Sequence, residues 1–220
     1  YYPKQLERLG FVKDQDWKEF KIYIPKEIPE KHIRISKIVR EKYGLRVVKV
    51  KDRKELLPYG PAVFETINKA YSNLYGYSEL SPAQIEYYTK LYIPMLRPEF
   101  VTLIVREKDE KVVGIAISMP NLSKALKLAN GKLFPFGFIH LLRALKGRLI
   151  HLYLMGVLPE YMNRGVNALL FNDLIPIYQK FGVEYAESNP ELETNMSVQM
   201  QWDYFERKHH KTRRAFIKKL

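Results

Sequence analysis

The sequence of 220 residues predicts an α/β (α+β) fold in which a central, mixed and mostly antiparallel sheet is flanked by helices. Residues Leu149 to Leu158 form a continuous apolar run of β character, which is typical of a strand buried on both faces. Phe100–Val105 and Val112–Ile117 flank a charged turn and predict two antiparallel strands. From Val166 to Phe181 the apolar residues recur at helical spacing, which predicts a helix after the central strand.

The remaining elements follow strand and helix patterns along the chain. Gly10 and Gly44 end two helical patterns, and Ser81-Pro82 begins another as cap and first-turn proline. In order, the further predicted elements are a strand at Phe20–Ile24, a helix ending at Tyr43, a strand at Leu45–Val50, helices at Leu56–Tyr75, Ser81–Leu96, Ser123–Ala129 and Phe138–Leu145, a strand at Gly182–Ser188, a helix at Asn195–Phe205 and a strand at Thr212–Lys219.

Three segments are expected. Residues 45–220 form the main domain, with an insert at residues 119–148 that is rich in aromatic and basic side chains. Residues 26–44 form a linker and a helix. Residues 1–25 are either the tail of a preceding domain of the same kind, which would pair with this one, or an N-terminal arm packed on the main domain. The chain begins with Tyr1 and not with Met, so we expect it to be a piece of a longer polypeptide.

The composition excludes several classes of protein. With 46% hydrophobic and 13% aromatic residues, the chain is globular and not disordered. It has no cysteine, which excludes a disulfide framework, a thiolate metal site and a cysteine nucleophile. Its histidines form no ligand cluster, so no metal is expected. No apolar run reaches transmembrane length and no signal segment opens the chain, so we expect a cytoplasmic protein without a membrane partner.

The net charge of +13 is concentrated in two clusters. No Asp or Glu occurs between Asn121 and Pro159. The first cluster comprises Lys124, Lys127, Lys132, Arg143, Lys146 and Arg148, and the second comprises Arg207, Lys208, Lys211, Arg213, Arg214, Lys218 and Lys219. Each cluster either attracts an anion, such as an acidic carrier protein, a nucleotide cofactor or nucleic acid, or is a solvated face. No recognised motif supports nucleic acid, which is therefore the less favoured partner.

The stretch after the central strand predicts an anion-binding site. Pro159–Gly165 breaks the strand, and the next helix begins near Arg164. A glycine-bearing turn that opens a helix leaves several backbone N–H groups without partners, with the positive end of the helix dipole behind them. This arrangement favours an anionic ligand.

The same stretch resembles motif A of the GNAT superfamily, the acyl-CoA N-acyltransferases, in which a strand ending in V-x-P-x-Y leads into Q/R-x-x-G-x-G/A. Val157, Pro159 and Tyr161 match the strand end, and the loop follows with Met162 and Asn167 in place of a polar and a small residue. The resemblance implies that acetyl-CoA or another acyl-CoA is the co-substrate. Its implied contacts are with Met155, Val157, Arg164, Gly165, Val166, Asn167 and Ala168.

The order of elements from Leu45 to Leu220 is also similar to the GNAT order, except for the final strand, whose place Phe20–Ile24 can take. Pro135-Phe-Gly137, Glu193-Thr-Asn195 and His210-Lys-Thr-Arg-Arg214 resemble segments of large bacterial GNAT-like proteins of unassigned substrate. The resemblance implies a GNAT fold and transfer of an acyl group, expected to be acetyl, to an amine acceptor. The acceptor is a small molecule or an acidic carrier protein. The alternative is a non-catalytic domain that binds acyl-CoA or an acyl carrier.

Attack of an amine on a thioester needs a base, an oxyanion donor and an acid. Glu187 and Glu193 are each either the base or a solvated turn residue. Asn195 either touches the cofactor arm, as the resemblance implies, or caps its helix. Seven residues later the family's acid, a tyrosine, is replaced by Trp202, which is expected to face the cleft and to contact acyl-CoA, and Tyr204 is the substitute acid.

Overall fold

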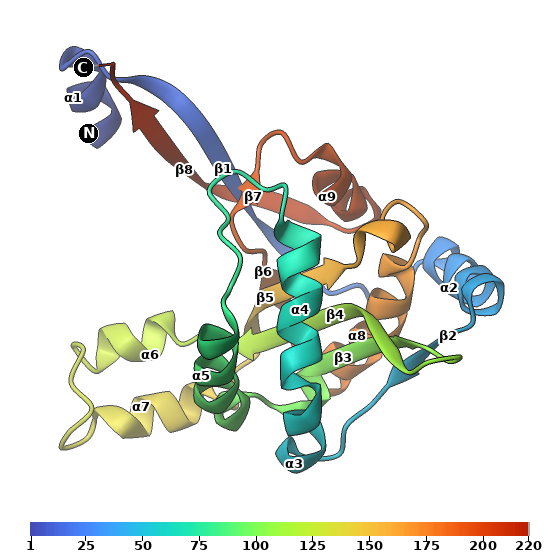
Figure 1. Ribbon diagram of the computed structural model, residues 1–220. Coiled ribbons are helices and arrows are strands. Elements are labelled where there is room, and N and C mark those ends of the chain that lie inside the picture. The colour runs from blue at the N-terminus through green and yellow to red at the C-terminus, as the bar shows by residue number, and fades with distance from the viewer. Residues whose placement is uncertain (220) are drawn as a thin grey trace.

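The computed structural model describes residues 1–219 of the chain (Figure 1). Its centre is an eight-stranded sheet with the order β2-β3-β4-β5-β6-β1-β7, and β8 also pairs with β1. Among the described residues β5 and β6 pair in parallel and all other pairs are antiparallel, which confirms the predicted mixed sheet. The strands are β1 (Val12–Tyr23), β2 (Leu45–Val48), β3 (Val101–Arg106), β4 (Lys111–Pro120), β5 (Leu149–Val157), β6 (Tyr185–Glu187), β7 (Glu191–Leu192) and β8 (Arg207–Ile217).

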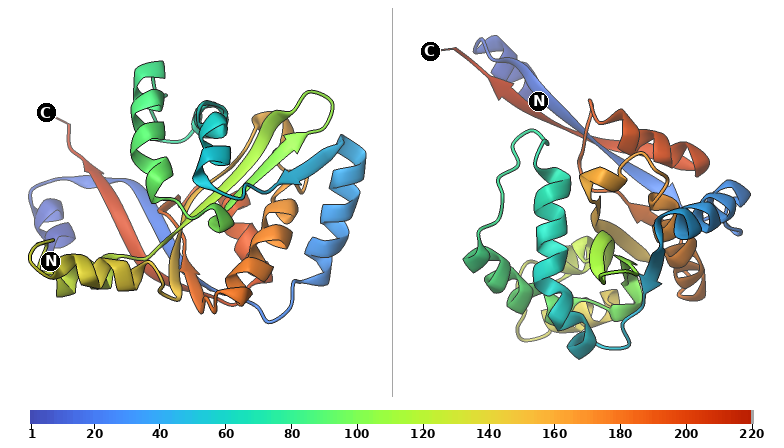
Figure 2. Two further views of the ribbon diagram at one scale, coloured as in Figure 1. Left: turned by 90° about the horizontal axis from the view of Figure 1, so that it is seen from below. Right: turned by 45° about the vertical axis from the view of Figure 1, so that its right-hand side comes forward.

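Helices cover both faces of this sheet (Figures 1 and 2). The α-helices are α1 (Tyr2–Arg8), α2 (Glu30–Tyr43), α3 (Arg53–Leu56), α4 (Gly60–Tyr71), α5 (Pro82–Tyr92), α6 (Ser123–Leu128), α7 (Gly137–Ala144), α8 (Asn167–Lys180) and α9 (Met196–Gln201). The 3-10 turns are η1 (Leu57–Tyr59), η2 (Ile93–Met95), η3 (Pro98–Phe100), η4 (Pro159–Tyr161) and η5 (Trp202–Tyr204). The helices α2 and α8 lie on one face, and α4 and α5 lie on the other.

The central strands alternate between two hydrophobic cores. In β3, Leu103 and Val105 belong to the core under α4, whereas Ile104 belongs to the core under α8. Successive side chains of a strand point to opposite faces, so a strand that is apolar throughout contributes to both cores. The continuous apolar run of β5 has the same cause, and Ile150 in that strand is fully buried.

The long N-terminal strand β1 completes the sheet. Lys21–Tyr23 pair antiparallel with β6, and the whole strand pairs with β8 from Val12 to Ile22. Phe20–Ile24 was expected in the place of the missing final strand, and β1 occupies that place. Beyond the body of the sheet, β1 and β8 continue as a two-stranded ribbon that ends beside α1 (Figure 1).

Several predicted boundaries were wrong because pairing between distant segments extended or shortened an element. β1 begins at Val12 and β8 at Arg207, since each strand supplies the other's hydrogen-bond partners over its whole length. The helix predicted at Asn195–Phe205 ends at Gln201 and gives way to η5. Two local signals were right: Gly44 ends α2 in the left-handed conformation, and Ser81 forms a capping box with Gln84.

The predicted insert forms a helical hairpin that extends from the body of the molecule (Figure 1). α6 and α7 pack against each other, with Ala125 and Gly137 buried between them. Within residues 1–219, no helix is both long enough and apolar enough to span a bilayer.

Candidate functional site

The site lies where β5 and β6 separate. The two strands pair through Leu149–His151 and Tyr185–Glu187, and β5 then continues to Val157 without β6 beside it. The chain that leaves β6 next pairs with β1 instead, through β7. A gap therefore opens in the sheet beside the second half of β5.

A β-bulge in β5 places two successive side chains on one face. Ile117 pairs with Leu154 and Ser118 pairs with Leu152, so Tyr153 is the extra residue. The side chains of Tyr153 and Leu154 both line a pocket under α4 and α5. The carbonyl oxygen of Tyr153 accepts a hydrogen bond from the side chain of Asn189, which follows β6.

The backbone of Met155 faces the gap. The Tyr71 hydroxyl donates to the Met155 carbonyl oxygen at 2.9 Å, and the same hydroxyl oxygen lies 3.4 Å from the Met155 nitrogen. These contacts show that both backbone groups of Met155 turn away from β4. α4 brings Tyr71 this close because Gly156 has no side chain: an added Cβ would lie only 3.2 Å from the Cβ of Ala70. Burial raises the pKa of Tyr71 to about 12, so its hydroxyl stays protonated.

The loop between η4 and α8 presents a row of backbone N–H groups. Asn163 and Gly165 both have positive φ angles, of 57° and 79°. Among the described residues, the N–H groups of residues 163–167 have no hydrogen-bond partner. They lie at the N-terminus of the 14-residue helix α8, where the helix dipole favours an anion. The predicted anion site therefore has the expected backbone geometry.

The side chains of this loop serve different purposes. Arg164 is exposed and its guanidinium lies 5.6 Å from the ring centroid of Tyr43, whereas Val166 and Ala168 are buried in the core. Asn167 donates to Gln201 at 3.0 Å, which ties α8 to α9. A Cβ on Gly165 would lie 2.6 Å from a methyl group of Ile35 in α2. Replacement of Gly165 would therefore disturb the packing of α2 as well as any ligand.

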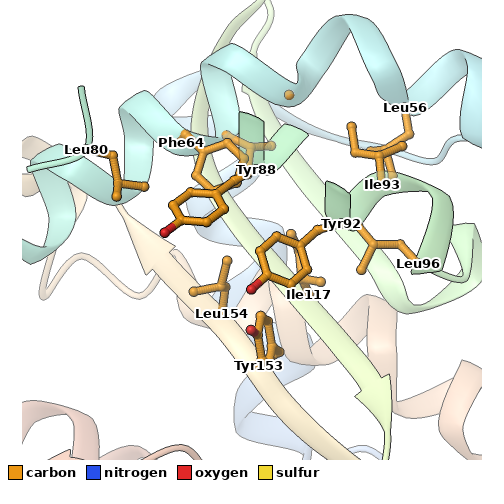
Figure 3. A pocket seen from close by; sticks show the side chains of 12 residues that line it. Leu56, Phe64, Leu80, Tyr88, Tyr92, Ile93, Leu96, Ile117, Tyr153 and Leu154 are labelled. Atoms are coloured by element: carbon orange, nitrogen blue, oxygen red, sulfur yellow. The ribbon is translucent and has the colours of Figure 1, made fainter. Parts of the chain in front are cut away.

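An apolar pocket lies between α4, α5, η2 and the bulged part of β5, at Tyr153 and Leu154 (Figure 3). Its volume is about 190 Å³. Leu154 and Ile117 form its sheet side, and the rings of Tyr88, Tyr92 and Tyr153 cluster together in the view of Figure 3. The Tyr92 and Tyr153 ring centroids are 6.1 Å apart. Its lining comes from six separate elements, α3, α4, α5, η2, β4 and β5, so no local sequence pattern predicts the pocket.

The opposite side of the gap is filled. Trp202 is 3% exposed, packs against Phe171 and Phe205, and donates its indole N–H to Glu191 at 2.8 Å. Trp202 and Met155 line a shared cavity of only about 20 Å³. Trp202 lines this small cavity, but its side chain is a core residue, and its predicted contact with acyl-CoA stays a prediction. Burial raises the pKa of Glu191 to about 7.

Tyr204 and Asn195 have local partners. The ring of Tyr204, 44% exposed, lies against His32, and its hydroxyl accepts a hydrogen bond from Lys31 in α2. Neither contact brings Tyr204 together with Met155. Asn195 accepts from the backbone of Val198 and from Ser197, so it caps α9. Its predicted contact with the cofactor stays a prediction.

Glu187 belongs to a buried charge network, not to a solvated turn. Its carboxylate lies 3.3 Å from the Lys211 ammonium and 3.7 Å from Nδ1 of His151. The same ammonium lies 3.3 Å from the buried Glu19. Burial lowers the pKa of His151, with Lys211 acting in the same direction and Glu187 opposing it. Glu193, by contrast, pairs with Lys13 in β1 at 2.5 Å, and no contact among residues 1–219 joins it to Glu187.

Sequence reasoning missed Tyr71 and His151. Both were overlooked because no local motif marks them: Tyr71 comes from α4, 84 residues before its partner in β5. Within residues 1–219, no group of three or more His, Cys, Asp or Glu side chains could hold a metal ion.

No protein-family model matches this chain. One curated relative, a bacterial ceramide synthase from Caulobacter vibrioides, is 28% identical over 149 residues. The match covers 66% of this chain and 37% of that protein, so the chain spans little more than a third of the relative's length.

Two solved structures share the architecture. A GCN5-related N-acetyltransferase from Sphaerobacter thermophilus has a TM-score of 0.59 at 14% identity, over 94% of this chain and 53% of that one. A GCN5-related glucosamine N-acetyltransferase region of a fungal multi-domain β-N-acetylglucosaminidase has a TM-score of 0.59 at 11% identity, over 98% of this chain and 22% of that one. These likenesses show that the chain has the GCN5-related N-acetyltransferase (GNAT) fold.

Proposed function

We propose that this protein is an N-acyltransferase that moves an acyl group from acyl-CoA to an amine. One observation carries the proposal: three features follow one another along β5 and the loop after it. The unpaired N–H groups of residues 163–167 can hold phosphates, the Met155 N–H faces the gap two residues before the strand ends, and the apolar pocket begins at Leu154. A phosphate group, a thioester and an acyl chain occur in this order in acyl-CoA.

The reaction is attack of the amine nitrogen on the thioester carbonyl carbon. The new C–N bond forms, the C–S bond breaks, the nitrogen loses a proton and the thiolate gains one. The backbone N–H of Met155 would donate to the oxyanion, because its distance of 3.4 Å to the Tyr71 oxygen leaves it weakly engaged. In the resting site the Tyr71 hydroxyl donates to the Met155 carbonyl oxygen, and this hydrogen bond breaks when Tyr71 gives its proton to the thiolate.

Tyr71 takes the role of acid in this proposal. Its hydroxyl already lies beside the Met155 N–H, and its raised pKa keeps the proton available at neutral pH. Trp202 cannot supply the proton, because an indole N–H is not acidic enough to protonate a thiolate. Tyr204 is less favoured, because its ring lies against His32 and no described contact joins it to Met155.

His151, oriented by Glu187, takes the role of base. Its ring lies on the same face of β5 as the Glu187 carboxylate, and its lowered pKa keeps the imidazole neutral at pH 7 and able to accept a proton. Glu187, the base expected from the sequence, is instead held by Lys211.

The pocket favours an acyl chain longer than acetyl. A cavity of 150 Å³ holds benzene, so about 190 Å³ accommodates roughly six to eight carbon atoms. Each buried methylene strengthens binding about fourfold. Ceramide is an N-acylated amine, so the name of the Caulobacter relative supports the same class of reaction.

Calorimetry with acetyl-, octanoyl- and palmitoyl-CoA, followed by assay of CoA thiol release with a panel of amines, tests the proposal. We expect octanoyl-CoA, whose chain the pocket can hold, to bind most tightly, and thiol to be released only when an amine is present. Leu154→Trp should abolish the preference for octanoyl-CoA while leaving acetyl-CoA binding unchanged. Equal binding of all three donors would contradict the assignment of the pocket.

The role of Tyr71 is tested by Tyr71→Phe, with Tyr77→Phe as the matched control. The two rings lie side by side, with centroids 5.7 Å apart, but the Tyr77 hydroxyl donates to Asn68 and not to Met155. Tyr71→Phe should lower kcat about a hundredfold at unchanged KM, and Tyr77→Phe should not. Tight binding of acyl-CoA without thiol release from the parent protein, whatever amine is added, would favour the non-catalytic alternative.

A further inference from the structure

The insert hairpin, residues 121–148, exposes more large apolar side chains than a solvated loop requires. Phe134 and Phe136, in the turn between its two helices, are 78% and 70% exposed. Further exposed apolar side chains on the hairpin are Leu126, Leu128, Leu133, Phe138, Leu142 and Leu145. On α7, Phe138, Leu142 and Leu145 follow the spacing of one helical face. Contiguous exposed apolar side chains of this kind mark an interaction surface.

The charges of the hairpin all have one sign. Its six basic side chains, Lys124, Lys127, Lys132, Arg143, Lys146 and Arg148, are exposed. None of them forms an ion pair with another residue of the described chain, 1–219. The sequence has no Asp or Glu between Asn121 and Pro159 that could neutralise them. The hairpin therefore presents apolar side chains and uncompensated positive charge together.

We propose that the insert hairpin docks on the surface of an anionic lipid bilayer. Phe134 and Phe136 enter the boundary between headgroups and acyl chains, and the basic side chains remain among the anionic headgroups. Each contribution alone gives weak and reversible binding, and the two together give a stable association. This docking does not depend on the proposed acyl transfer.

The hairpin holds its apolar tip in a fixed conformation. A Cβ on Gly137 would lie 1.8 Å from the Lys132 carbonyl oxygen, so the turn closes tightly on the start of α7. The rings of Phe134 and Phe138 lie 6.1 Å apart. The tight turn limits the conformations open to the tip, which lowers the entropy lost on docking.

The apolar side chains decide between a bilayer and the acidic carrier protein expected from the sequence. Both partners would attract the basic side chains, but charge complementarity with an acidic carrier does not account for two exposed phenylalanines at the tip of a projecting turn. A bilayer offers hydrocarbon at that point. The proposal replaces the earlier expectation of no membrane partner.

Co-sedimentation with vesicles of phosphatidylcholine and phosphatidylglycerol, compared with phosphatidylcholine alone, tests the proposal. We expect binding to the anionic vesicles, with Phe134→Ser/Phe136→Ser weakening it at least about tenfold. Ile33→Ser/Ile38→Ser is the matched control, because these two exposed apolar residues of α2 lie outside the hairpin. The control should bind as the parent does.

A second measurement reports the position of the tip directly. The two natural tryptophans, Trp17 and Trp202, lie outside the hairpin, so the emission of Phe134→Trp minus that of the parent reports on residue 134. We expect a blue shift with anionic vesicles and none with purified acyl carrier protein. Absence of vesicle binding by the parent, an equal loss in the α2 control, or a shift only with the carrier protein would overturn the proposal.

Discussion

The two basic clusters are similar in the sequence but have different surroundings in the structure. In β8, Arg214 forms two hydrogen bonds with Asp16, at 2.7 and 2.9 Å, and Lys211 lies 3.3 Å from both Glu19 and Glu187. Those carboxylates are buried in the sheet and need a partner. The basic side chains of the insert hairpin have no such partners within residues 1–219. Three side chains of the β8 cluster, Lys211, Arg213 and Arg214, neutralise the protein's own buried acids, whereas the hairpin cluster is free to bind an external anion.

The largest expected effect comes from removing charge in the insert hairpin. Lys132→Gln/Arg143→Gln/Lys146→Gln should weaken binding to anionic vesicles about a hundredfold, at about fivefold for each base. Its thermal stability should equal that of the parent, since no folded-state ion pair is lost. Vesicle titration and a thermal melt check both outcomes, and a fall in melting temperature would mean that the hairpin bases stabilise the fold after all.

Removing an acid that pairs with β8 should change stability and leave vesicle binding unchanged. Asp16→Asn should lower the free energy of unfolding by about 1–3 kcal/mol. The effect should lie towards the lower end of this range, because Arg214 is partly exposed to solvent. Vesicle binding should not change. The Arg214 guanidinium lowers the pKa of Asp16 to about 2. A lowered native pKa stabilises the fold above the unfolded value of about 4.

This stabilisation is therefore lost as the pH falls from about 4 to about 2. Denaturant unfolding of the parent and of Asp16→Asn across this range measures the difference, which should shrink towards the acid end. If the difference in the free energy of unfolding between the parent and Asp16→Asn stayed constant over this pH range, the Asp16–Arg214 pair would not be its cause.

Salt provides a smaller and simpler comparison. Because the hairpin bases are exposed, raising the ionic strength should weaken vesicle binding several-fold. The partly buried ion pairs of β8 are screened less, so the melting temperature should change little. A sodium chloride series that records both quantities on one sample checks this. Parallel changes would indicate that the two clusters share one environment.

The smallest expected effect concerns His151. The Lys211 charge disfavours the protonated imidazole, so Lys211→Met should raise the pKa of His151, with Glu187 and Glu19 left to favour the charged form. Since a protonated imidazole cannot act as base, the acid limb of kcat/KM should move to higher pH with it. Imidazole NMR titration of both proteins measures the shift, and Lys208→Met serves as a control. An unchanged His151 pKa would mean that Lys211 acts only on the carboxylates.

Much of the fold could be predicted because its signals are local. The apolar run of β5, the left-handed Gly44 and the capping box at Ser81 each depend on residues close in sequence, and each was found where it was predicted. The loop of residues 163–167 also follows from local turn chemistry. The limits of β1 and β8 could not be predicted, because each strand extends as far as a partner almost 200 residues away continues to pair with it.

By itself the sequence determined the order of strands and helices, the glycine-bearing turn before α8, and the position of Met155 near the end of the central strand. These depend on periodicity, turn residues and spacing, which act over a few residues. The tertiary structure alone decided that Tyr71 contacts Met155, that His151 contacts Glu187, and that Trp202 is in the core. It also decided that basic side chains of β8 are paired with buried acids while those of the hairpin are not, within residues 1–219. Contacts between distant segments are fixed by packing, and packing depends on the whole chain at once.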